Sequence, residues 1–85
     1  MLHGADDARL TRNAWREVSK RRVDAAWLQV KVMRGVCYMD GQIRNIRANR
    51  DARLQDELKA IVDGIREMRG IRDVVVDVRL IDMAW

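Results

Sequence analysis

The sequence predicts an α+β domain, a two-layer sandwich in which two helices cover one face of a three-stranded sheet in the order α-β-β-α-β. Three patterns carry this prediction: a four-residue apolar period near the N-terminus, a two-residue alternation around an Arg-Gly pair, and a second helical period followed by a valine-rich run. A chain of 85 residues holds one domain. We expect that domain over residues 6–82, with short tails at 1–5 and 83–85.

The first helix is expected to follow the N-terminal tail. Leu10, Ala14 and Val18 recur at every fourth position, which places them on one face of a helix of about four turns. Asp6 or Asp7 can cap this helix by accepting hydrogen bonds from its free N–H groups.

The segment after residue 27 predicts a β-hairpin whose register follows from its turn. Apolar and polar residues alternate over 28–33 and again over 36–43. Arg34-Gly35 fits a two-residue type I′ turn, because both positions of that turn require positive φ. Met33 then faces Val36, and directly opposed residues share a face of the sheet. The face expected to be buried holds Leu28, Val30, Val32, Cys37, Met39, Gly41 and Ile43.

The second half of the chain predicts a long helix and a final strand. Apolar residues over 54–68 follow a helical spacing, with Asn49 or Asp51 as candidate caps and Gly70 as the expected left-handed residue at the C-terminal end. The run 73–81 alternates and is rich in valine, as strands are. This last strand can lie beside either strand of the hairpin, and the sequence leaves that choice open.

Two segments together resemble a known family. Residues 34–43, RGVCYMDGQI, combine a turn glycine, alternating aliphatic residues, a small polar residue and a second glycine; residues 68–78, MRGIRDVVVDV, join a glycine-aliphatic pair to a valine-rich strand. In this spacing they resemble the BON domain family over about residues 24–82. The resemblance implies a module without catalytic residues that binds phospholipid surfaces or other envelope components. Gly35, Gly41 and Gly70 match the family's glycine positions and are interpreted as structural.

Residue types needed for catalysis or metal binding are scarce. His3 is the single histidine and Cys37 the single cysteine, so no intramolecular disulfide can form. Cys37 is expected to be a buried structural thiol, because a reactive cysteine needs an electropositive, partly exposed site. No glycine-rich phosphate loop of the GxxxxGK[ST] type is present. We therefore expect no enzyme, no cofactor and no metal site.

The positive charge offers one candidate binding surface. The formal net charge is +4, which permits binding to anionic lipid or nucleic acid. Arg44, Arg47, Arg50 and Arg53 precede the second helix, where free backbone N–H groups favour anions. This series is the candidate anion- or lipid-binding site, and the alternative is an ordinary solvated connection.

The open face of the sheet is the other candidate surface. Its large residues are expected to be Trp27, Met33, Val36, Tyr38, Val75 and Ile81. Exposed apolar patches usually mark partner surfaces, so a homo-oligomer is expected here. The alternative is that charged residues between them keep this face solvated.

The candidate partners are an anionic lipid, an envelope protein or a second copy of the chain. A small basic nucleic-acid-binding domain is the alternative, in which Trp27 and Tyr38 stack against bases. No run approaches the ~20 apolar residues that span a bilayer, and residues 1–7 lack the apolar core of a signal peptide. The chain as written is therefore expected in the cytoplasm, or in the envelope or periplasm if it is part of a longer exported protein.

Overall fold

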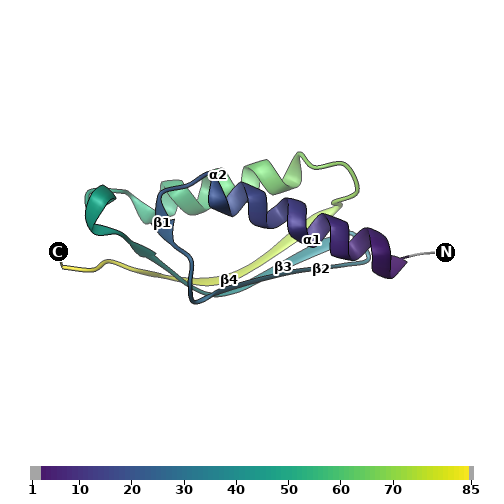
Figure 1. The fold of residues 1–85 in the computed structure, drawn as a ribbon, viewed down its shortest axis with the longest axis horizontal. Helices are drawn as coiled ribbons and strands as arrows, with labels where there is room; N and C mark the ends of the chain where they lie inside the picture. The colour runs from purple at the N-terminus through teal and green to yellow at the C-terminus, as the bar shows by residue number, and fades with distance from the viewer. Residues whose placement is uncertain (1–2, 85) are drawn as a thin grey trace.

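The structure is a computed structural model that describes the backbone of residues 3–84 and the side chains of residues 6–84. Its elements follow one another as α1 (His3–Ser19), β1 (Val23–Asp24), β2 (Leu28–Met33), β3 (Val36–Asn45), the 3-10 helix η1 (Arg47–Asn49), α2 (Leu54–Arg66) and β4 (Asp73–Ile81). Both α-helices lie on the same side of the sheet (Figure 1). The α+β class with two helices is therefore confirmed.

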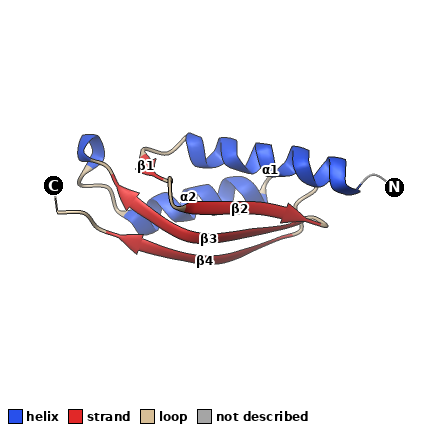
Figure 2. Cartoon of the chain, turned by 60° about the horizontal axis from the view of Figure 1, so that its bottom comes forward, coloured by secondary structure: helices blue, strands red, loops and turns tan. Residues whose placement is uncertain are grey.

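β3 is the central strand, and every other strand pairs with it. β1 and β2 pair antiparallel with one edge of β3, and β4 pairs in parallel with the other edge. Figure 2 shows β3 between β2 and β4. The last strand thus lies beside the second strand of the hairpin. α2 is the crossover between the parallel pair, since parallel neighbours cannot be joined by a tight turn.

The sheet has four strands rather than the expected three, because the chain between α1 and β2 adds the short strand β1. Leu28 pairs with Gly41, and Val23 pairs with Asn45. Between these two pairs the chain covers five residues on the side of β1 and β2 but only four on β3. The additional residue forms a bulge that separates β1 from β2. A two-residue strand of this kind leaves little periodicity to read in a sequence.

The predicted hairpin register is confirmed. Arg34 has φ 52° and Gly35 φ 80°, as a type I′ turn requires, and Met33 pairs with Val36. The loop between α2 and β4 packs against this turn. Arg72 donates from its backbone N–H to the Gly35 carbonyl at 2.8 Å and from Nε to the Arg34 carbonyl at 3.0 Å. The turn is thereby tied to the start of β4.

Glycine is required at position 41 because the backbone of Trp27 approaches it closely. Its φ is 101°, and a Cβ at this position would overlap the carbonyl oxygen of Trp27. That carbonyl accepts a hydrogen bond from the backbone N–H of Gln42 at 3.0 Å. Glycine at residue 41 therefore lets the bulge close against β3.

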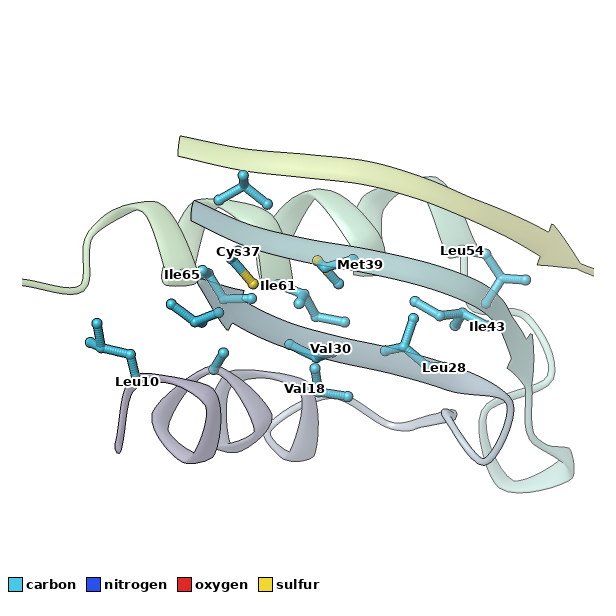
Figure 3. Packing of buried hydrophobic residues seen from close by; sticks show 13 residues of the cluster. Leu10, Val18, Leu28, Val30, Cys37, Met39, Ile43, Leu54, Ile61 and Ile65 are labelled. Atoms are coloured by element: carbon cyan, nitrogen blue, oxygen red, sulfur yellow. The ribbon is translucent and has the colours of Figure 1, made fainter. Parts of the chain in front are cut away.

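The core lies between the helices and the inner face of the sheet (Figure 3). Leu10, Ala14 and Val18 are buried, as their spacing predicted, and so are Ile61 and Ile65 of α2. The remaining buried apolar residues are Leu28, Val30, Val32, Cys37, Met39, Ile43, Leu54 and Val74. The predicted inner face of the hairpin is therefore confirmed at its aliphatic, methionine and cysteine positions.

The ends of the helices differ from the sequence-based expectations. α1 begins at His3, inside the expected tail, so Asp6 and Asp7 lie within its first turns. Asp7 instead accepts a hydrogen bond from the backbone N–H of Arg34 at 3.1 Å. α2 begins after Arg53 without a side-chain cap, and it ends at Arg66, so Gly70 belongs to the following loop. Capping signals failed here because tertiary contacts use the same polar groups.

Replacing Gly41 with alanine is expected to destabilise the fold by at least about 2 kcal/mol, because a β-carbon there meets the Trp27 carbonyl and φ is positive. Urea unfolding followed by circular dichroism measures the change. Gln42→Ala is the matched control, with an expected loss below about 1 kcal/mol. Equal losses in the two variants would contradict the close approach.

Candidate functional site

The face of the sheet turned away from the helices is uncovered. No helix of the described chain lies on this side (Figure 1). Trp27 is 60% exposed, Met33 47%, Tyr38 43% and Val75 43%, which is high for large apolar side chains. The other two residues expected on this face, Val36 and Ile81, are half-buried. The fold thus brings six residues from three separate segments onto one surface, called here the outer face.

The strand register arranges the outer face in rows that run across the sheet. From the hairpin turn outward the rows are Met33, Val36 and Asp73; Lys31, Tyr38 and Val75; Gln29, Asp40 and Asp77; Gln42 and Arg79; and Asp24, Arg44 and Ile81. Directly opposed residues share a face, so each row is a strip of neighbouring side chains. Apolar groups therefore gather in the two rows nearest the hairpin turn, and every row carries at least one charged residue.

Arg44 lies on the outer face. The sequence groups it with Arg47, Arg50 and Arg53, which lie elsewhere. The Arg44 guanidinium lies over the Trp27 ring at 5.3 Å from the ring centre. Its Nη2 donates to Oε1 of Gln42 at 3.3 Å, while its Nε is buried without a hydrogen-bond partner. The stack is a cation–π contact that holds the exposed indole in one orientation.

Charges on the outer face differ from those on the helices in how they are paired. On the helical side, ion pairs join Asp6 to Arg9, Glu17 to Lys20, Glu57 to Arg21 and Asp63 to Lys59, at 2.7–3.8 Å. Among the described side chains, no ion pair involves Lys31, Asp40, Asp77 or Arg79. The outer face therefore keeps its charges available to a partner.

The other three arginines of the predicted series lie together at the far end of the molecule from the hairpin turn. Arg47 is in η1, Arg50 follows it, and Arg53 directly precedes α2; all three are exposed. Arg22, which lies between α1 and β1, joins them. Its Nη2 donates to the Ala48 carbonyl at 3.4 Å, and its own carbonyl accepts from Asn49 Nδ2 at 3.1 Å.

Sequence reasoning missed Arg22, because its distance from residue 47 along the chain hides their contact. It also missed Asn45, the one buried polar residue among the described core positions. The Asn45 side chain donates to the Arg50 carbonyl at 2.9 Å and accepts from the Met83 backbone N–H at 2.6 Å. It thereby fixes the arginine-bearing connection against the C-terminal segment. A lone asparagine at a strand end gives no sequence signal for this role.

A groove of about 450 Å³ runs between α2 and the free edge of the sheet. Leu58 and Val62 of α2 and Val76 and Leu80 of β4 form its apolar wall. Val76 is 40% exposed although it points to the helical side. α2 therefore does not fully cover the outermost strand.

Within the described part of the chain, no three His, Cys, Asp or Glu side chains are gathered at metal-binding distance. The side chain of His3 lies outside the described side chains. No helix in the same part of the chain is long and apolar enough to cross a bilayer.

Comparison with models of known protein families gave no match, and no curated protein proved similar to the chain.

Cys37 is fully buried on the inner face of β3. Burial raises the pKa of its thiol to about 11, because the thiolate would lose its hydration. Neutral thiol is therefore the stable form in the folded chain, and the residue acts as a small apolar side chain.

The free energy of unfolding is expected to fall between about pH 9 and about pH 11 on account of Cys37. The folded-state pKa lies above the 9.0 of a solvated thiol, so the stabilisation is complete below pH 9 and is lost as pH rises to about 11. Urea titrations across this range should show wild type losing about 2 kcal/mol more than Cys37→Ala. Parallel pH profiles for the two proteins would refute the shift.

Proposed function

We propose that this chain is a non-enzymatic binding and assembly module that acts through protein–protein association at the outer face. The observation that carries the proposal is the exposure of Trp27, Met33, Tyr38 and Val75, from 43% to 60%, on a single sheet face. Large apolar side chains gathered on one exposed surface mark a partner site, because burying them releases hydration water.

The composition of the outer face also supports this proposal. Aromatic residues and methionine are enriched in protein interfaces, and Trp27 and Tyr38 have few rotatable bonds to immobilise on binding. Lys31, Asp77 and Arg79 lie between the apolar groups without ion-pair partners of their own in the described chain. Such charges supply specificity to an apolar contact. The resemblance to BON domains points in the same direction, toward a binding module rather than an enzyme.

The proposal is tested with the tagged full chain in an extract of the cells that produce it. Proteins retained by the chain, including untagged copies of the chain itself, are purified and titrated against variants. Trp27→Ser/Tyr38→Ser is expected to bind its partner at least ten times more weakly, because two exposed aromatic anchors are lost. Arg12→Ser/Arg16→Ser, on the exposed side of α1, is the control and should bind as wild type does.

Equal binding by the outer-face variant and wild type would contradict the proposal. Failure of the chain to retain any protein that titrates in purified form would contradict it as well.

A second candidate function is binding to anionic phospholipid surfaces through the arginine end. The specific observation is that Arg22 is held beside η1 by two hydrogen bonds, which adds a fourth guanidinium to Arg47, Arg50 and Arg53. Clustered arginines are attracted to a negative membrane surface.

Arg50→Ser/Arg53→Ser is expected to bind vesicles of phosphatidylserine and phosphatidylcholine roughly thirty-fold more weakly than wild type, at about 1 kcal/mol per basic residue near the surface. Co-sedimentation measures this. Arg66→Ser/Arg69→Ser removes the same charge at the other end of α2 and should change binding less than threefold. Stronger, salt-sensitive binding to single-stranded RNA would favour the nucleic-acid alternative instead.

A further inference from the structure

We infer that the outer face binds a second copy of this chain across a two-fold axis. The axis runs across the strands, between the row of Asp40 and Asp77 and the row of Gln42 and Arg79. This inference rests on the proposed function and names the partner that the outer face takes. It follows from the order of the charges along β4, as the register fixes it.

The two-fold arrangement stacks each strand on its own copy, running in the opposite direction. Asp77 of one copy then lies over Arg79 of the other, and the symmetry repeats the pair, so two ion pairs form at the centre. Asp40 lies over Gln42 of the second copy, whose amide can donate a hydrogen bond to the carboxylate. The central rows are therefore complementary in charge and in hydrogen bonding.

The same axis also brings the next rows into favourable contact. Val75 lies over Ile81 of the second copy, and Tyr38 lies over Arg44 of the second copy. Lys31 pairs with Tyr38, and Asp24 pairs with Arg44, so Lys31 lies over Asp24 of the second copy. Stacked sheets rotate by about 30° relative to each other, which moves the outer rows more than the central ones. The central ion pairs therefore depend least on this rotation.

Placements of the axis through a charged row put like charges together. An axis through the row of Asp40 and Asp77 stacks both carboxylates on their own copies, and an axis through Arg79 stacks two guanidinium groups. An axis parallel to the strands and centred on β3 again places Asp40 on itself. An axis moved by one row toward either end of β4 stacks Val75 on Asp77 or Arg79 on Ile81. Among the axes that run across the strands, only the one between residues 77 and 79 joins opposite charges of β4 next to the axis.

The area of the outer face suits a reversible dimer. β4 has nine residues, which span about 30 Å, and the molecule measures 17 Å along its shortest axis, which runs roughly across the strands (Figure 1). The strip therefore offers roughly 500 Å² per copy, near the lower limit of about 1,000 Å² in total for a specific interface. A dissociation constant in the micromolar range is expected.

Analytical ultracentrifugation from 5 to 500 µM tests the inference with charge variants. Wild type is expected to shift from the 9.9 kDa monomer to the dimer, and the shift should weaken as salt rises. Asp77→Arg alone and Arg79→Asp alone place like charges opposite each other, and each should raise the dissociation constant at least tenfold. An equimolar mixture of the two variants should form a heterodimer within threefold of the wild-type affinity, because both central pairs are restored.

Glu67→Arg, at the C-terminal cap of α2, and Arg66→Asp, at its last residue, are the matched controls, since they make the same charge changes away from the outer face. They should dimerise as wild type does. The mixture also controls for folding, because misfolded variants would not restore association.

A wild-type chain that stays monomeric to 500 µM would overturn the inference and leave the proposed function to the capture experiment. A dimer that is insensitive to both outer-face charges but weakened by Trp27→Ser/Tyr38→Ser would overturn this axis alone. A dimer insensitive to all of these changes would overturn both the inference and association through the outer face.

Discussion

Hydrogen bonding by β3 on both of its edges is the constraint on which the rest of the structure depends. β2 and β1 occupy one edge and β4 the other, so both halves of the chain meet on one strand. Because β4 runs parallel to β3, the chain must return through a crossover, and α2 supplies it. With α1 on the same side of the sheet, the apolar stripes of both helices pack against one face. No element of the described chain covers the opposite face.

That asymmetry explains why the outer face is chemically unlike an ordinary solvent face. A sheet with one solvated side usually alternates apolar and polar residues cleanly. Here Met33, Tyr38 and Val75 occupy solvent-side positions, and the exposed Trp27 ring stacks against Arg44 on the same face. On the helices, three ion pairs join charges one turn apart, whereas Asp77 and Arg79 are two residues apart on one strand. Asp77 and Arg79 form no ion pair with each other or with another described residue, so both remain available to a partner.

The positive charge of the chain is concentrated elsewhere. Arg47, Arg50 and Arg53 carry it at the end of the molecule where β3 finishes, and Arg22 adds to it. Asn45 holds this connection to the backbone of the C-terminal segment. The outer face, by contrast, carries Lys31, Arg44 and Arg79 against Asp24, Asp40, Asp73 and Asp77, which leaves one negative charge in excess. A surface of mixed charge and a basic end are suited to different partners.

The sequence by itself determined the faces of the elements. Side-chain direction repeats every 3.6 residues in a helix and every two in a strand, so Leu10, Ala14 and Val18 could be placed in the core, and the Arg34-Gly35 turn fixed which hairpin residues oppose one another. These are local consequences of backbone geometry. The tertiary structure alone decided that β4 lies beside β3, that Gly41 meets the Trp27 carbonyl, and that Arg22 reaches η1. Each of these contacts joins segments that are far apart in the sequence. Which of them meet depends on the packing of the whole chain, and a local periodicity does not reveal it.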